Sequence, residues 1–329
     1  MDPIIEAILE LTRPIGITEP VLQFMLINAI LGLSMYVVLY TGMFSLANAG
    51  FMAIGAYCAA LLTKDLDWSL WAAVIASMGV SGVIAIPVGL PVLRLRDIYL
   101  AIATIGFGEV VRVFFLNIDE GIVWFRNTFE GLDLNPRRYQ VFGGGRGVRG
   151  ISQLTDVESL VIFLVIAAFF IVRLQRSRLG RAMAAVREDE SAAANMGINV
   201  VYVKNMAFII SAMLAGAAGA FYAHRVLLVQ PEMFGFDQAV DILAFAVLGG
   251  TSVWPGPIVG GMILTALPEV LRFLNEYRGV FNGAVLLIVI VYFPGGVINP
   301  SGWAAVYRSL RDRLRGSPKP VEAPAERGD

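Results

Sequence analysis

Two charged residues lie inside an apolar stretch of the chain, where a charged side chain is energetically costly. Glu109 and Arg112 lie three residues apart in the segment Ile98–Leu116, so they would share one face of a helix. Ionisable side chains within a membrane-spanning segment are costly and by default indicate function. The pair could line the path of a charged solute. It could equally be a buried ion pair, or a contact to a partner subunit, that keeps helices in register.

Polar residues also occur in a glycine-rich interruption of the apolar pattern, Gly42–Gly55, which contains Ser45 and Asn48. A second interruption spans Gly249–Gly261. In transporters such breaks often mark the substrate path, because irregular backbone is tolerated at membrane depth only where it lines a cavity or is buried in protein. Close helix packing through small residues explains the same pattern, and an Asn in a span more often bonds a neighbouring helix than a ligand.

A mixed-charge segment between two apolar runs has the features of a docking element. Asp189 is a plausible N-cap of a short helix that runs to about Met196, and Gly197 is a plausible C′ residue that ends it. A short capped polar helix could carry a push from a soluble partner into the flanking membrane helices. The alternative is a solvated loop whose arginines only set the orientation of the chain.

Several chemistries are excluded by what the 329 residues lack. No Gly-Lys pair occurs, so the chain has no P-loop, and Cys58 and His224 are the only cysteine and histidine. We therefore expect no catalytic residues, no metal site and no cofactor in this chain. The net charge of −1 gives no indication of a nucleic-acid partner.

The elements that must position these residues are membrane helices. Hydrophobic residues make up 57% of the chain and charged residues 16%, against about 45–50% and about 25% in soluble domains. Runs of roughly 20 apolar residues predict spanning helices. We expect an all-α polytopic transmembrane bundle of about 8–10 helices, with Ala239–Gly249 too short to span alone. The expected crossings are Val21–Thr41, Phe44–Thr63, Ser69–Leu93, Ile98–Leu116, Val157–Val172, Val203–Val229, Ile258–Leu274 and Phe281–Phe293.

This pattern divides the chain into an N-terminal segment (1–20), a permease domain (21–300) that includes a cytoplasmic loop (174–202), and a tail (301–329) predicted to be cytoplasmic and disordered. Basic residues in that loop, in the tail and in the turn Arg94–Asp97 place all three in the cytoplasm. Parity puts the long loop Ile118–Asp156 outside. The segment Phe44–Thr63 could be a broken or re-entrant piece instead of a full crossing.

The mixed-charge segment SRLGRAMAAVREDESAAANMGI (Ser177–Ile198) closely resembles the cytoplasmic coupling region of branched-chain amino acid ABC permeases, of the kind called LivM. The resemblance covers most of residues 30–300, with several motifs in the right order. Departures occur in GMFSLANAGF, where the family usually reads G-Q-x-S-L-G-x-x-A-F, and in the external loop. Further matching stretches are RLRDIYLAIATIGFGEVVRVFFLN (Arg94–Asn117), KNMAFIISAMLAGAAGAFYA (Lys204–Ala223) and VLGGTSVWPGPIVGGMILTALPEVLR (Val247–Arg272).

The resemblance implies the membrane-spanning permease of an ATP-driven importer in the bacterial inner membrane, of ABC importer type. Its implied partners are a homologous LivH-like permease, two ATP-binding subunits that hold ATP and Mg, and an extracytoplasmic binding protein. Leucine, isoleucine and valine are the expected substrates, with urea, short amides or other hydrophobic amino acids as the alternative. A secondary transporter coupled through Glu109 is a further alternative. Docking to the ATP-binding subunit is implied for Gly180, Arg181, Arg187, Glu188, Asp189, Glu190 and Gly197.

Overall fold

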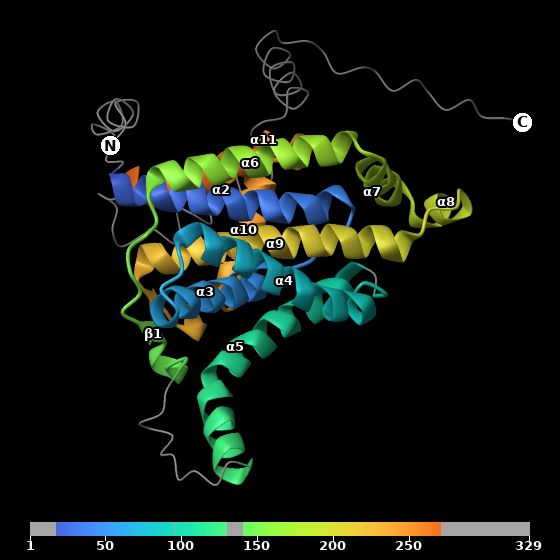
Figure 1. Cartoon of the computed structure of the whole chain (residues 1–329). Coiled ribbons are helices and arrows are strands. Elements are labelled where there is room, and N and C mark those ends of the chain that lie inside the picture. Colours follow the sequence, from blue (N-terminus) through green and yellow to red (C-terminus); the bar gives the residue numbers. More distant parts are fainter. Residues whose placement is uncertain (1–17, 96, 130–140, 271–329) are drawn as a thin grey trace, which may run out of the picture.

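The computed structural model describes residues 18–95, 97–129 and 141–270. Within these ranges the chain is almost entirely helical (Figure 1). The α-helices are α2 (Glu19–Tyr40), α3 (Asn48–Asp65), α4 (Leu70–Val92), α5 (Asp97–Phe129), α6 (Val157–Arg176), α7 (Arg178–Glu188), α8 (Glu190–Asn195), α9 (Val200–Val226), α10 (Phe236–Gly249) and α11 (Pro255–Val270).

Short irregular elements close one end of the bundle. The strand β1 (Val148–Arg149) pairs antiparallel with β2 (Leu228–Val229), and the 3₁₀ turns are η2 (Gly144–Arg146) and η3 (Pro231–Phe234). Helices α7 and α8 lie at the opposite end (Figure 1). That this second end is the cytoplasmic one, as the basic residues around it indicate, stays a prediction.

Five of the described helices are long and apolar enough to cross a membrane: α2, α4, α5, α6 and α9. The expectation of an all-α polytopic membrane protein is therefore confirmed. The predicted crossing Phe281–Phe293, the N-terminal residues 1–17 and the tail 301–329 lie outside the described residues.

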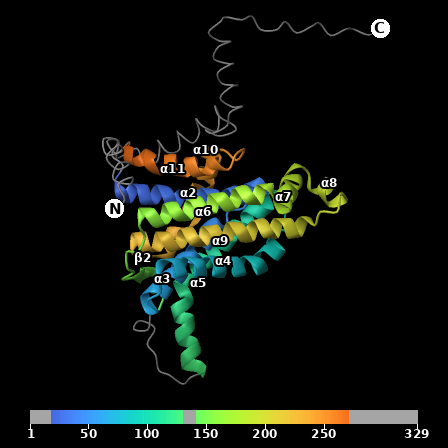
Figure 2. The ribbon, with the colours of Figure 1, turned by 45° about the horizontal axis from the view of Figure 1, so that its top comes forward.

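Helix α9 is the centre of the bundle and packs against α2, α3 and α4 (Figure 2). Small residues permit the closest approach. A Cβ atom at Gly55 of α3 would lie 2.1 Å from the carbonyl oxygen of Gly216 in α9, so these two backbones touch. Such contacts are typical of membrane helices, where packing and not hydrophobic exclusion drives association.

Helix α5 is longer than the sequence predicts. We expected an external loop to begin at Ile118, but the helix continues to Phe129. Asp119 and Glu120 suggested an end to the span. Instead the Asp119 carboxylate is buried and accepts backbone N–H bonds from Val141, Phe142 and Gly144 at 2.9–3.1 Å. An acidic residue whose bonds are satisfied in this way does not terminate a helix. The last turns of α5 project away from the bundle (Figure 1).

Helices α10 and α11 form an antiparallel hairpin that packs on α2. Asn28 of α2 donates to the hydroxyl of Thr265 at 2.8 Å, and a Cβ at Gly32 would meet the carbonyl oxygen of Pro257 at 2.4 Å. Helix α11 therefore begins beside Gly32 and runs antiparallel to α2. Because α2 continues to Tyr40, about 12 Å further at 1.5 Å per residue, the hairpin turns inside the bundle. The predicted crossing Ile258–Leu274 thus begins inside the bundle, and its residues after Val270 lie outside the described chain.

Candidate translocation and coupling site

The first break in the bundle is the chain between α2 and α3. Helix α2 ends at Tyr40, and Gly42 adopts a left-handed φ of 80° that turns the chain back into the bundle. The irregular segment then ends at Asn48, where α3 begins. Thr104 of α5 accepts the backbone N–H of Leu46 at 2.9 Å, which satisfies a donor that has no helical partner. The segment Phe44–Thr63 therefore begins with four irregular residues and continues as an unbroken helix, α3.

This break and the α10–α11 turn lie at the same level of α2. Asn48 bonds Ser34 of α2, and α11 begins beside Gly32, two residues away on the same helix. The two glycine-rich interruptions of the sequence are therefore both non-helical or helix-terminal backbone within the bundle. Such backbone must be buried in protein or line a water-filled cavity. That they mark the substrate path stays a prediction.

Asn48 ties three helices together. Its amide donates to the hydroxyls of Ser34 in α2 and Ser211 in α9, at 2.8 and 3.0 Å. The Ser211 hydroxyl in turn donates to the carbonyl oxygen of Ser34 at 2.8 Å. All three side chains are buried, as is that of Ser45. Asn48 thus makes interhelical hydrogen bonds, and the sequence did not identify its partners because serines in apolar runs carry no distinctive pattern.

Glu109 and Arg112 form an ion pair within α5. The Nε atom of Arg112 donates to both carboxylate oxygens of Glu109, at 3.0 and 2.9 Å. The pair is not buried within the described chain, since 51% of the Glu109 side chain and 26% of the Arg112 side chain are exposed. The buried-pair interpretation is therefore wrong for the chain taken alone.

The ion pair adjoins the first break. Glu109 lines a small cavity of about 20 Å³ together with Leu46 of the irregular segment and Gly235 and Phe236 at the start of α10. The structure thus brings Glu109 close to the segment that holds Ser45 and Asn48. The coupling residues lie mainly on α7 and α8, at the end of the bundle opposite β1 and β2 (Figure 1).

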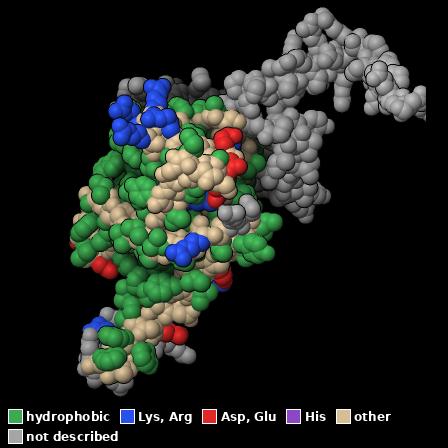
Figure 3. All heavy atoms as spheres, turned by 90° about the vertical axis from the view of Figure 1, so that its right-hand side faces the viewer, with side chains coloured by type: hydrophobic (Ala, Val, Ile, Leu, Met, Phe, Trp, Pro, Cys, Tyr) green, Lys and Arg blue, Asp and Glu red, His purple; other side chains and the backbone are tan. Residues whose placement is uncertain are grey.

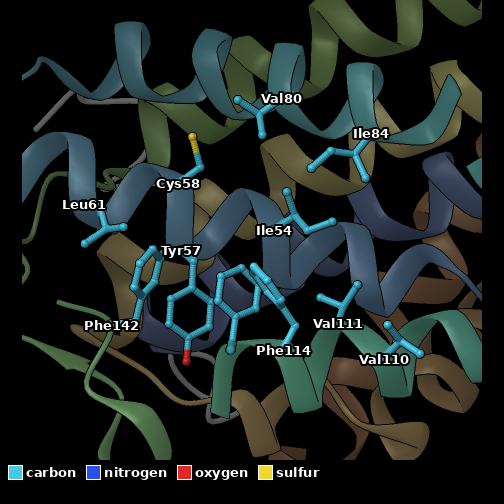
Figure 4. A pocket seen from close by; sticks show the side chains of 11 residues that line it. Ile54, Tyr57, Cys58, Leu61, Val80, Ile84, Val110, Val111, Phe114 and Phe142 are labelled. Carbon is cyan, nitrogen blue, oxygen red and sulfur yellow. The ribbon is translucent and has the colours of Figure 1, made fainter. Parts of the chain in front are cut away.

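A larger cavity of about 390 Å³ lies between α3, α4 and α5 (Figure 4). Its lining is apolar except for Tyr57 and Cys58, and no charged side chain reaches it. Tyr57 stacks on Phe115 with ring centroids 4.0 Å apart, which closes one side. A free amino acid carries two charges that need partners, so this cavity does not suit one.

The mixed-charge segment folds into two capped helices, of which the sequence predicted the second. Ser177 caps α7 by accepting from the backbone N–H of Gly180 at 3.1 Å, and Asp189 caps α8 by accepting from that of Ala192 at 2.8 Å. Gly197 follows α8 with a φ of 83°. The predicted N-cap and C′ residues are therefore confirmed as structural features. Basic and acidic side chains gather on different parts of this end of the molecule (Figure 3).

The coupling residues differ in what they contact. Arg181 and Glu188 are exposed, and Arg181 bonds the carbonyl oxygen of Arg176 at 2.9 Å. Gly180 is buried, and a Cβ there would lie 2.1 Å from the carbonyl oxygen of Leu174, so α6 and α7 could not approach with a larger residue. Arg187 lies against the first break, because a Cβ at Gly42 would be 3.0 Å from its Cα. The coupling segment thus touches the start of the irregular chain directly.

One residue that the sequence did not single out anchors this segment. The ammonium of Lys204, in the first turns of α9, forms an ion pair with Glu190 in α8. Only 5% of the Lys204 side chain is exposed. A lysine within the apolar run that follows the loop was the available signal, since a buried lysine requires a partner. Glu190 therefore has a structural role inside the chain.

Comparison with known proteins places the chain among transport permeases. Residues 17–290 match the model of the family described as branched-chain amino acid transport system / permease component. The high-affinity branched-chain amino acid transport system permease protein LivM of Salmonella typhimurium is 36% identical over 83% of this chain and 68% of that protein. LivM of Escherichia coli is 35% identical over 85% and 70%, and LivH of Escherichia coli is 33% identical over 45% and 48%. No solved structure matches significantly.

Proposed function

Because the chain belongs to the family of branched-chain amino acid transport permeases, we propose that it moves leucine, isoleucine and valine across the bacterial inner membrane as one subunit of an ATP-driven importer. It supplies the membrane path and no catalytic group. A LivH-like permease, two ATP-binding subunits and an extracytoplasmic binding protein complete the importer, and ATP with Mg is bound by the ATP-binding subunits.

The observation that carries the coupling part of the proposal is the contact between Arg187 and Gly42. Helices α7 and α8 are amphipathic, capped and exposed at the end of the bundle, where a soluble subunit can reach them. Displacement of α7 by that subunit would press on the chain that leads into α3. The first step of the proposed movement therefore spans only a few ångströms, from Arg187 of α7 to Gly42. No other element lies between them.

The test of coupling uses a charge reversal that spares the fold. Glu188→Lys changes an exposed side chain that makes no hydrogen bond or ion pair within the described residues, so we expect about tenfold lower ATP-driven leucine uptake and weaker retention of the ATP-binding subunit. Asp189→Asn is the companion variant, because Asn keeps the capping oxygen while it removes the charge. The readout is leucine uptake in vesicles that hold the complete importer, with the yield of membrane-inserted chain as the control.

Unchanged uptake in both variants would remove the docking role from these residues. Leucine uptake that continues without ATP, driven by an ion gradient alone, would instead favour a secondary transporter. Retained ATPase binding with no response to leucine would leave the importer class intact and make urea or a short amide the next solute to test.

A further inference from the structure

The outer surface of the bundle has an apolar part and a charged part. This difference indicates which part faces lipid and which part faces protein. The exposed faces of α4 and α6 carry no charge at membrane depth: α4 has no charged residue, and α6 has none between Glu158 and Arg173. Large apolar side chains cover both faces. They include Ile75, Val83, Ile86, Val161, Val165, Ile166 and Phe169.

The face formed by α5, η3 and α10 is different, and we call it the charged face. It carries the Glu109–Arg112 pair on α5, and Asp237 and Asp241 one turn apart on the exposed side of α10. The two helices are adjacent here, since a Cβ at Gly235 would contact the side chain of Arg112 at 4.0 Å. The Glu109–Arg112 pair thus adjoins the start of α10.

Depth makes this surface unsuitable for lipid. Helix α5 starts at Asp97, so Glu109 lies about 18 Å along it, within a hydrocarbon core of about 30 Å. A charged side chain at the centre of a membrane costs at least about 2.5–3.5 kcal/mol. The irregular segment before α3 also adjoins this face at Leu46, and backbone of that kind is not left open to lipid.

We infer that the charged face is the surface that meets the homologous permease subunit, and that α4 and α6 face lipid. This inference rests on the proposed function, which supplies that subunit. Among the described residues, η3, α10 and the turn of α5 from Glu109 to Arg112 carry four carboxylates, those of Glu109, Glu232, Asp237 and Asp241, and one cation, that of Arg112. Carboxylates in such excess stay charged only where water reaches them, so the contact between the subunits encloses a hydrated gap. Both breaks then lie beside the gap, and not at the lipid boundary.

The test places a photo-reactive side chain on each kind of surface in the co-expressed, purified importer. Phe236→p-benzoylphenylalanine probes the charged face, and Phe169→p-benzoylphenylalanine is the matched control on α6, with exposed fractions of 56% and 68%. A second pair, at Val113 and Val165, repeats the comparison on α5 and α6 in case one variant fails to assemble. Adducts are identified by mass spectrometry of the linked peptides.

We expect adducts with the homologous permease at Phe236 and Val113 at least tenfold above those at Phe169 and Val165, which should capture lipid only. Adducts at Phe236 and Val113 only with lipid, or only with residues 271–329 of the same chain, would overturn the inference while leaving an importer that still binds its ATPase. Adducts with the homologous permease mainly at Phe169 would overturn it as well. Absence of any homologous permease from an ATPase-bound complex would overturn it too, whereas absence of the ATPase would overturn the proposed function.

Discussion

The described chain contains two ion pairs with opposite surroundings. Lys204–Glu190 joins two helices and has a buried lysine, whereas Glu109–Arg112 lies within one helix and is largely exposed. The Lys204–Glu190 pair has its structural role within the chain, because it holds α8 against α9 where the polypeptide changes direction. The second fixes nothing within the chain, because residues three apart on one helix are held by the backbone already. Burial by a neighbour is what would give the second pair a role.

The largest effect on stability is expected at the Lys204–Glu190 pair. Glu190→Gln leaves the buried ammonium of Lys204 without its carboxylate. Breaking one partner of a buried pair costs about 3–5 kcal/mol, and the 37% exposure of Glu190 reduces this, so we expect about 2 kcal/mol. The measurement is the thermal unfolding midpoint of the purified, isolated chain in detergent. Glu188→Gln, two residues earlier and exposed, is the control and should leave the midpoint unchanged.

A second variant separates charge from packing. Glu190→Gln combined with Lys204→Met removes both charges, and such replacement is often close to neutral. The double variant should therefore recover most of the midpoint that Glu190→Gln loses. Equal loss in both variants would show that Lys204 is held by something other than its ion pair.

A middle effect is expected at the polar cluster of the first break. Asn48→Ala removes two buried hydrogen bonds that join α3 to α2 and α9. Interhelical bonds in membranes contribute about 0.6 kcal/mol on average and up to about 1.7, so the expected loss is about 1–2 kcal/mol. Asn117→Ala is the matched control, because that exposed Asn bonds only the carbonyl oxygen of Val113 in its own helix. An unfolding midpoint equally lowered in both variants would contradict a special role for the cluster.

The sequence predicts local features well and tertiary ones poorly. The caps at Asp189 and Gly197 were correct because capping depends on side chains within a few residues. The depth at which the chain turns between α10 and α11 was not predicted, because it depends on where Pro257 meets Gly32 on another helix. The continuation of α5 past Ile118 depends on backbone donors at residues 141–144 that satisfy Asp119. Hydropathy contains neither contact.

The ion pair on α5 had two sequence interpretations that differ only in what surrounds it. The spacing of three residues predicted that Glu109 and Arg112 share a helix face and form a pair, and both features are observed. Whether the pair is buried depends on what packs against Glu109 from outside the described chain. A single sequence holds no information about a surface supplied by another subunit, so this part of the site could not be predicted.

The smallest effect on the chain itself is expected at this exposed pair. Glu109→Gln with Arg112→Gln should change the unfolding midpoint of the isolated chain in detergent by the equivalent of less than about 0.5 kcal/mol, since a pair three residues apart on a helix contributes about 0.2–0.5 kcal/mol. Retention of the homologous permease should nevertheless fall, because the charged face loses the Arg112 cation and the carboxylate paired with it. Glu120→Gln, further along α5, is the control for both readings. Destabilisation of the isolated chain comparable to that of Glu190→Gln would mean that both ion pairs stabilise the chain itself to the same extent. The contrast between a pair with a role inside the chain and a pair that needs a neighbouring subunit would then be wrong.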